Sequence, residues 1–160
     1  MSREYPDRPW IGIGVIAFRG EEVLLVRRGK PPRVGSWSLP GGAQHLGETA
    51  QEAARRELLE ETGIEVGPLL LADVIDAVTR DEAGAVRYHY TILDFCAEWT
   101  GGEARPGDDV EAVAWAGPAA LDGYELTREA RAVIALARLR MTAAASPASA
   151  PPRAAVPPAR

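Results

Sequence analysis

Two periodicities alternate along this chain: the two-residue period of half-buried strands and the longer spacing of amphipathic helices. Residues 11–18 and 23–26 are short runs rich in Ile and Val, which predict two strands. Residues 68–78 and 87–99 predict two long strands, and residues 110–116 predict a further one. The turn residues 19–22 predict an antiparallel hairpin between the first two, and residues 81–84 join the two long ones. We expect these segments to form one sheet.

Two further segments carry helical signals. Thr49 and Glu52 have the spacing of a capping box and Gly63 supplies a stop, which predicts a helix over residues 49–62. Residues 127–141 predict a second helix with one apolar face. Strands, a helix, more strands and a final helix predict an α/β fold, an α/β/α sandwich in which a mixed central sheet is covered on both sides.

The composition changes this picture only at the C-terminal end. A chain of 160 residues, 46% hydrophobic and 26% charged, suits one globular domain. We place that domain at residues 1–141, because residues 142–160 are almost entirely Ala, Pro, Ser and Arg and predict a disordered tail. The apolar run at residues 10–18 is too short to span a bilayer and follows no signal-peptide pattern, so we expect a cytoplasmic protein with no membrane partner.

Charge and cysteine usage narrow the classes of partner. The single cysteine, Cys96, excludes an internal disulfide and a Cys-rich metal site, so any metal would be held mainly by oxygen. The net charge of −5 disfavours a nucleic-acid duplex as a partner. A small anion would need a bridging cation or a local basic patch, and the one dense basic stretch holds Arg27, Arg28, Lys30 and Arg33. The alternative is that this stretch is a solvated loop.

Three carboxylates share one face of the first predicted helix. Glu57, Glu60 and Glu61 stand at i, i+3 and i+4, within an arc of about 100°. Like charges at this spacing repel one another, and a hard divalent cation such as Mg²⁺ would relieve the repulsion. Taken alone, the same face is also typical of a solvated helix in which Arg55 and Arg56 are the partners of the glutamates.

A longer pattern surrounds these glutamates. From Gly42 the chain runs through five residues to Glu48 and through seven more to the segment Arg56-Glu57-Leu58-Leu59-Glu60-Glu61-Thr62-Gly63-Ile64. This pattern is similar, position for position, to the signature of the Nudix hydrolase family. The preceding Leu39-Pro40-Gly41-Gly42 segment and the order of the predicted elements also resemble that family.

The resemblance to MutT-like Nudix hydrolases implies a Nudix fold that holds Mg²⁺ or Mn²⁺ against the pyrophosphate of a small nucleotide. It implies that Arg56 fixes the glutamates by ion pairing and that a carboxylate removes a proton from the attacking water. The implied metal ligands are Glu57, Glu60 and Glu61, with a carbonyl of Gly41 or Gly42. Glu48 would reach the metal through water or pair with Arg56. The candidates for the general base are Glu60 and Glu61 in the helix and Asp108, Asp109 and Glu111 in a later loop.

The sequence leaves three alternatives for the function: two substrate classes and a module without turnover. The segment from Arg27 to Gly42 and the strands resemble the ADP-ribose pyrophosphatase type, which favours a nucleoside diphosphate linked to a sugar. Many such enzymes have a Pro about fifteen residues past the signature, where this chain has Thr79 and Arg80. The alternatives are release of pyrophosphate from a nucleoside triphosphate, including an oxidised one, and a non-catalytic module that senses a nucleotide.

Basic and aromatic side chains are expected to contact the substrate. The sequence is also compatible with a homodimer. The basic candidates are Arg27, Arg28 and Arg33, which would bind phosphate. The aromatic candidates for stacking on a base are Tyr88, Tyr90, Trp37 and Phe95, each of which is alternatively a core residue.

Overall fold

The computed structural model describes residues 2–31 and 33–146, which form one mixed sheet with a helix on each face. Within these residues the elements, in chain order, are β1 (Trp10–Arg19), β2 (Glu22–Arg28), β3 (Trp37–Ser38), β4 (Gly41–Ala43), α1 (Ala50–Thr62), β5 (Glu65–Val66), β6 (Leu70–Arg80), β7 (Val86–Gly101), β8 (Val110–Ala116), a 3₁₀ helix η1 (Pro118–Tyr124) and α2 (Arg128–Ala145). The expected α/β/α sandwich is confirmed.

Strand β1 lies at the centre of the sheet. It runs parallel to β7 over its whole length, from the pair Trp10 and Tyr90 to the pair Phe18 and Glu98. On its other side β1 pairs antiparallel with β4 near its start and with β2 at its end. Strand β8 extends the sheet beyond β2, and β6 pairs antiparallel with β7. The expected hairpin between the first two strands is therefore confirmed, and the sheet is mixed because β1 and β7 run the same way.

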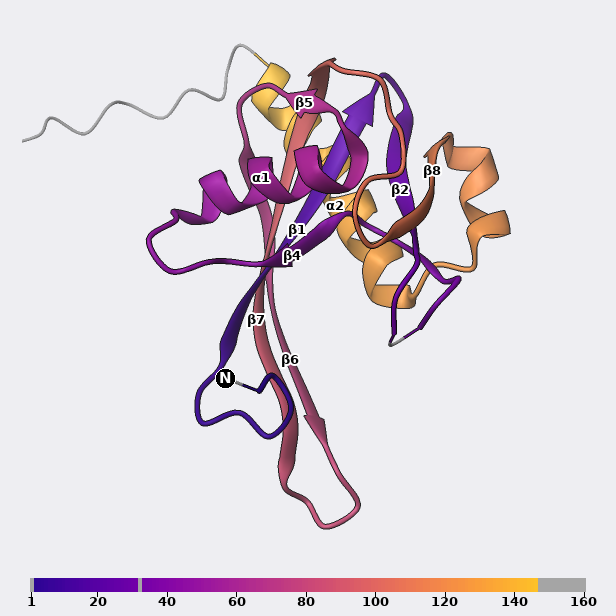
Figure 1. Ribbon diagram of the computed structural model, residues 1–160. Coiled ribbons are helices and arrows are strands. Elements are labelled where there is room, and N and C mark those ends of the chain that lie inside the picture. The colour runs from indigo at the N-terminus through magenta and orange to yellow at the C-terminus, as the bar shows by residue number, and fades with distance from the viewer. Residues whose placement is uncertain (1, 32, 147–160) are drawn as a thin grey trace, which may run out of the picture.

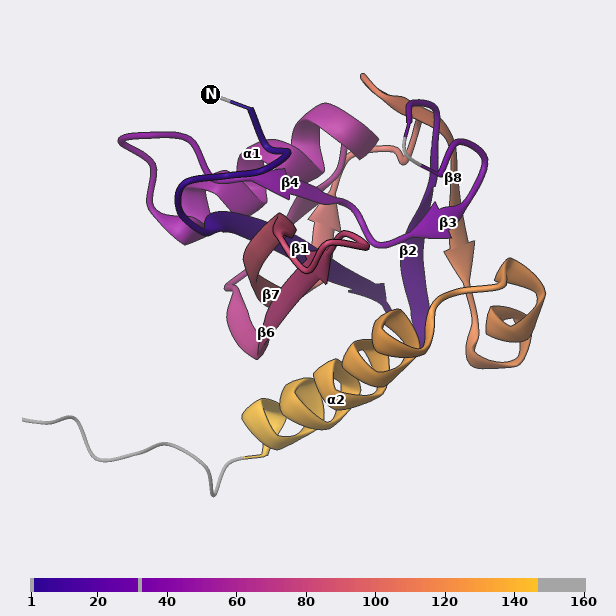
Figure 2. The ribbon, with the colours of Figure 1, turned by 90° about the horizontal axis from the view of Figure 1, so that it is seen from below.

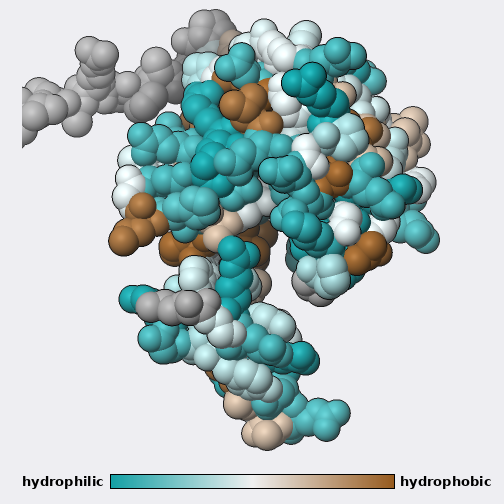
Figure 3. All heavy atoms as spheres, viewed as in Figure 1, coloured by the Kyte–Doolittle hydropathy of each residue, from teal (hydrophilic) through white to brown (hydrophobic). Residues whose placement is uncertain are grey.

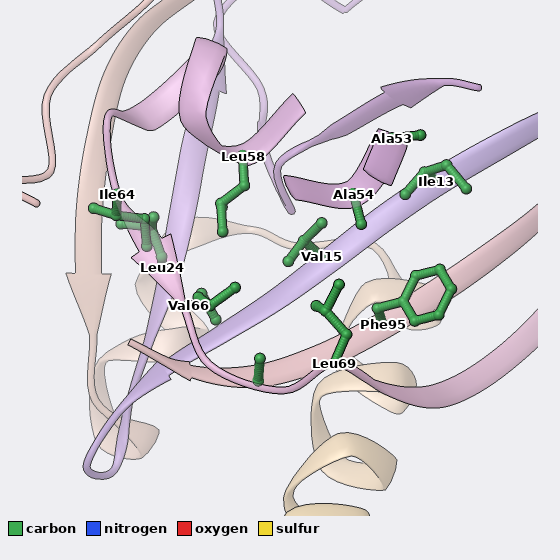
Figure 4. Packing of buried hydrophobic residues seen from close by; sticks show 12 residues of the cluster. Ile13, Val15, Leu24, Ala53, Ala54, Leu58, Ile64, Val66, Leu69 and Phe95 are labelled. Carbon is green, nitrogen blue, oxygen red and sulfur yellow. The ribbon is translucent and has the colours of Figure 1, made fainter. Parts of the chain in front are cut away.

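The two faces of the sheet bury separate hydrophobic clusters, because successive residues of a strand point to opposite faces. Odd-numbered residues of β1, such as Ile13 and Val15, pack under α1 with Leu58 and Phe95 (Figure 4). Even-numbered residues, such as Ile16, pack against α2 on the other face. Figures 1 and 2 show α1 and α2 on opposite sides of the sheet.

The hairpin of β6 and β7 extends beyond both helices, away from the rest of the sheet (Figure 1). Its base lies between the helices, whereas its tip contacts the N-terminal segment. There the Tyr5 N–H donates to the Arg87 carbonyl at 2.8 Å, and Arg87 donates to Glu4 at 2.8 Å.

Helix α2 corrects one expected boundary. It continues to Ala145, so residues 142–145, which we assigned to the tail, are helical. The run Ala143-Ala144-Ala145 explains the extension, since Ala has the highest intrinsic helix propensity. The rest of the predicted tail, from residue 147 on, lies outside the described residues. Within the described part of the chain, neither helix has the length and apolar character needed to cross a bilayer.

Candidate active site

Local chemistry places the glutamate-bearing helix as expected. Thr49 caps its start: the Thr49 hydroxyl accepts from the Glu52 N–H at 3.2 Å, and the Glu52 carboxylate accepts from the Thr49 N–H at 2.7 Å. At the other end Gly63 adopts a left-handed conformation with φ 72° and donates its N–H to the Leu59 carbonyl. The buried side chains Ala53, Ala54 and Leu58 dock the helix on the sheet. The signature glutamates consequently lie beside the packed surface rather than under it.

Arg56 lies at the centre of the cluster and binds three of the four signature glutamates. Its guanidinium donates to Glu48 at 2.5 and 3.0 Å, to Glu57 at 2.8 Å and to Glu60 at 3.3 Å. A further bond at 3.1 Å reaches the Ala43 carbonyl at the end of β4. The side chain of Arg56 is only 21% exposed. Bonds from Arg56, followed by one from the His45 N–H, lower the pKa of Glu48 to about 2.

Glu61 is held separately, from the β4 side. Its Oε2 accepts from the Gly41 N–H at 2.9 Å, which ties the helix to the glycine pair that precedes the signature. Burial raises the pKa of Glu61 to about 7 against the lowering effect of that bond, and the negative charge of Glu57 raises it further. Arg28, at the end of β2, lowers this pKa and is therefore close enough to Glu61 for its charge to act there.

Gly42 makes room for the Glu57 carboxylate. A Cβ built at Gly42 would overlap both oxygens and the carboxyl carbon of Glu57, so no other residue could stand there without displacing that carboxylate. The Glu57 side chain is 13% exposed and faces the backbone of β4. Carboxylate oxygens of α1 and the backbone of Gly41 and Gly42 therefore share one place at the edge of the sheet.

The donors at this place suit a hard divalent cation. Within residues 2–31 and 33–146, no three Asp, Glu, His or Cys side chains converge on one point, since Arg56 binds Glu57 and Glu60 while the Gly41 N–H binds Glu61. Mg²⁺ is bound in proteins by one or two carboxylates together with waters and substrate phosphates, and a closed cage of protein ligands is not required. An open, oxygen-only group of Glu57, Glu60 and Glu61 beside the backbone of Gly41 and Gly42 fits that description.

The loop that carries Asp108 and Asp109 packs on the C-terminal end of α1. The Gly107 N–H donates to the Glu61 carbonyl and the Arg105 N–H to the Thr62 carbonyl, both at 2.9 Å. Asp109 adopts a left-handed conformation with φ 64°, forms an ion pair with Lys30, and has a negative charge that raises the pKa of Glu61. The structure thus brings Asp109 near Glu61.

The other loop candidates for the general base differ in their surroundings. Asp108 is exposed, and Glu111 on β8 pairs with Arg27 at 3.0 Å. Glu111 is therefore bound to Arg27 on the neighbouring strand β2.

The basic candidates for substrate contacts lie at different places. Arg28 lies near Glu61, whereas Arg27 pairs with Glu111 and has its guanidinium carbon 5.9 Å from the centre of the Trp37 ring. Arg33 is exposed in the loop that joins β2 to β3. The structure therefore brings Arg28 into electrostatic reach of a signature glutamate.

The aromatic candidates divide between the hairpin and the cores. Tyr88 and Tyr90 are half-buried on β7, and Tyr90 pairs with Trp10 of β1. Trp37 packs edge-on against Tyr124, with ring centres 5.0 Å apart. Phe95 was a wrong candidate for base stacking: it is 6% exposed and lies in the cluster under α1, because its position on β7 points to that face.

The face of the molecule that carries α1 is hydrophilic. Polar side chains cover most of the face that carries α1 (Figure 3). A hollow of about 220 Å³ lies behind α1, lined by Leu58, Ile64 and Thr100 among others, and its lining includes none of the signature glutamates. Phosphate groups could approach Glu60 from solvent, since its side chain is 54% exposed.

Comparison with known proteins assigns the chain to a family. The profile of the NUDIX domain matches residues 8–137, and the chain therefore belongs to the Nudix family. The MutT NUDIX hydrolase from Burkholderia pseudomallei has the same fold, with a TM-score of 0.68 and 31% identity over 81% of this chain and 98% of that one.

Two curated relatives carry different substrate names. An ADP-ribose pyrophosphatase from Methanocaldococcus jannaschii is 34% identical over 103 residues, which are 64% of this chain and 59% of the relative. A protein of Mycobacterium tuberculosis named "Putative 8-oxo-dGTP diphosphatase 2" is 37% identical over 99 residues, 61% of this chain and 65% of the relative. The matched part of this chain thus spans about three fifths of each relative.

Proposed function

We propose that this protein is a metal-dependent hydrolase that cleaves a pyrophosphate linkage in a nucleoside diphosphate derivative, with an ADP-ribose-type nucleotide sugar as the preferred substrate. The observation that carries the proposal is the junction of α1 and β4. There the Glu61 carboxylate accepts from the Gly41 N–H, and Glu57 occupies the space left by Gly42. Acidic oxygens and the backbone of the glycine pair are thereby held together at the protein surface.

The residues around this junction have distinct tasks. Bound Mg²⁺ or Mn²⁺ would neutralise phosphate oxygens and lower the pKa of the attacking water. Arg56 orients Glu57 and Glu60 through its guanidinium and is itself held by Glu48 and the Ala43 carbonyl. Glu61, with a pKa of about 7, is suited to accept the proton of the water near neutral pH. Arg28 adds positive charge on the β2 side for a phosphate group.

Two substrate classes are supported by relatives. The relative named ADP-ribose pyrophosphatase favours a nucleotide sugar, and the relative named for 8-oxo-dGTP favours a nucleoside triphosphate as the second candidate. Attack of water on one phosphorus of ADP-ribose breaks the anhydride and gives AMP and ribose 5-phosphate. Attack on a triphosphate at its α-phosphorus gives a nucleoside monophosphate and pyrophosphate. A purely nucleotide-sensing role is disfavoured because all four signature glutamates are present.

The products separate the candidates. The protein is incubated with Mg²⁺ and a panel of nucleotides that contains ADP-ribose, normal triphosphates and 8-oxo-dGTP, and the products are identified by chromatography. The proposal expects AMP and ribose 5-phosphate, with kcat/KM for ADP-ribose above that for any triphosphate. A kcat/KM more than about tenfold higher for a triphosphate would transfer the assignment to the second class.

A further inference from the structure

Asp94 on β7 is the one charged side chain among the buried residues of the described chain. It is 5% exposed, and no described residue donates a hydrogen bond to its carboxylate. The other buried polar side chain, Thr62, donates its hydroxyl to the Leu58 carbonyl. The charge that acts on the pKa of Asp94 is that of Asp73, which has the same sign. Burying an unpaired carboxylate is costly, so a side chain of this kind calls for a functional explanation.

The Asp94 carboxylate lies across β1 toward the signature loop. Asp94 pairs with Gly14 of β1, and Gly14 pairs in turn with Gly41 of β4. A Cβ built at Gly14 would collide with Oδ1 of Asp94, so the carboxylate occupies the space that a side chain on β1 would fill. It is therefore one strand away from the glycine that binds Glu61, but on the opposite face of the sheet from α1.

Helix α2 stops short of this place. Its cluster contains Ile16 and Cys96, which pair with each other, and the next pair on the same face is Gly14 and Asp94. The next pair on this face is Gly12 and Ile92, and a Cβ at Gly12 would lie 3.2 Å from the Ile92 side chain and 3.7 Å from the edge of the Tyr90 ring. Figure 3 shows open space between the β6–β7 hairpin, which carries Tyr90, and the loop that joins β2 to β3. The Asp94 carboxylate thus lies at Gly14 and the edge of the half-buried Tyr90 ring lies near Gly12, with Ile92 between Tyr90 and Asp94 on the same face of β7.

The chemistry of this face excludes phosphate and favours a base. A carboxylate repels phosphate oxygens and accepts hydrogen bonds, and neighbouring Asp73 adds a second negative charge. The Tyr90 ring, near the next glycine of β1 on this face, Gly12, offers a surface for a flat group. Burial, followed by the charge of Asp73, raises the pKa of Asp94 to about 6, which agrees with a carboxylate that lacks a partner within the protein.

We infer that Asp94 and Tyr90 form the subsite for the nucleobase of the substrate, with Asp94 accepting a hydrogen bond from an amino group of a purine. The inference rests on the proposed function only in taking the ligand to be a nucleotide. Phosphates would lie at the edge of β4, near Glu57, Glu61 and Arg28. The base would pass over Gly41 and Gly14 to the other face, where Asp94 makes a polar contact that selects the base.

Nucleotide binding tests the subsite without catalysis. AMP and purine riboside 5′-monophosphate differ only in the 6-amino group, and neither contains a pyrophosphate bond. Their affinities are measured by isothermal titration calorimetry on the full chain with Mg²⁺ present. We expect the wild type to bind AMP at least about tenfold more tightly, the lower end of the scale of one hydrogen bond to a charged group. Asp94→Leu, which keeps the branched shape and removes the acceptor, should bring the two affinities within about twofold.

Two further variants separate recognition from a structural effect. Asp94→Asn should retain the preference for AMP, because a carboxamide pairs with the amino group and N1 of adenine. Asp73→Leu is the matched control: it removes a carboxylate from the same face, one whose Oδ1 already accepts from the Val74 N–H, and should leave the preference unchanged. Circular dichroism verifies that each variant is folded.

Any of four results would overturn the inference: no binding of either nucleotide, equal affinities in the wild type, an intact preference in folded Asp94→Leu, or an equal loss in Asp73→Leu. If the preference behaves as expected but no pyrophosphate substrate is cleaved, the subsite stands and the proposed hydrolase function fails. If a pyrophosphate substrate is cleaved but AMP and purine riboside 5′-monophosphate bind equally, the proposed hydrolase function stands and the subsite fails.

Discussion

Replacing Arg56 by Met tests whether one guanidinium organises the glutamate cluster. Met has a similar length but cannot donate a hydrogen bond, so Glu48, Glu57 and Glu60 lose a common partner. The side chain is 21% exposed, which makes its ion pairs stronger than surface pairs but weaker than fully buried ones. We expect a loss of roughly 2 to 3 kcal/mol in the free energy of unfolding at neutral pH. We also expect kcat/KM to fall by more than about a hundredfold, since Glu57 and Glu60 are no longer oriented.

The pH dependence of this loss identifies its cause. The pKa of Glu48 is lowered from 4.5 to about 2 in the folded protein, chiefly by Arg56. A carboxylate with a depressed pKa contributes stability that is present above its unfolded value and is lost as the pH falls through the folded one. The stability difference between wild type and Arg56→Met should therefore be complete at about pH 7 and shrink from about pH 4.5 downward.

Urea unfolding at several pH values and a carboxyl NMR titration of Glu48 provide the assay. In the variant the pKa of Glu48 should return toward its ordinary value. Arg55→Met is the matched control, because Arg55 donates to the Val66 and Gly67 carbonyls and to none of the signature glutamates. It should lose stability but keep kcat/KM within about threefold. A stability difference for Arg56→Met that is as large at pH 3 as at pH 7, or an unchanged pKa for Glu48, would refute the reasoning.

Three other variants probe separate parts of the site. Glu61→Gln should lower kcat by at least about a hundredfold with little change in fold. Product formation measured at fixed times under saturating metal tests this expectation. A kcat near that of the wild type would move the role of general base to Asp109. Gly42→Ala should lower kcat/KM by at least about tenfold, because its Cβ displaces the Glu57 carboxylate, and activity at the wild-type level would contradict that placement. Asp94→Asn should stabilise the protein relative to wild type, since a carboxyl whose folded pKa is raised costs stability as the pH rises from about 4 to about 6. That gain is on the order of 3 kcal/mol above pH 6, and a urea-unfolding gain that does not grow with pH would show that Asp94 is not costly.

The helix that carries the signature could be predicted in detail because its ends are encoded locally. Thr49 with Glu52 at one end and Gly63 at the other form the cap interactions that their types and spacing indicate. The short strands β3, β4 and β5 were not predicted, since two or three residues are too few to display a period. Their pairing depends on partners elsewhere in the chain, and β4 is the strand that brings Gly41 to Glu61.

Asp94 shows what sequence patterns alone do not reveal. A signal was present, since a charged residue stands inside the apolar run of residues 92–97. Its meaning depends on β1 running parallel to β7 in a register that sets Gly14 opposite Asp94. The same register points Phe95 into the core under α1, so its ring is not available for base stacking. The sequence does not show that register, and Phe95 was therefore a wrong candidate. The pairing between strands determines which face of the sheet each strand residue points to, whereas the residues at a helix end determine where the helix stops.

The central claim, metal-dependent cleavage of a nucleotide pyrophosphate at the Glu57 and Glu61 junction, is tested most directly by following ADP-ribose with ³¹P NMR. One sample contains the protein with Mg²⁺, and a second contains the same protein with excess EDTA. The account predicts that the pyrophosphate signals are replaced by those of two phosphate monoesters in Mg²⁺ and persist in EDTA. Full turnover in EDTA, or intact pyrophosphate in Mg²⁺ for ADP-ribose and for every other nucleotide of the panel, would contradict it.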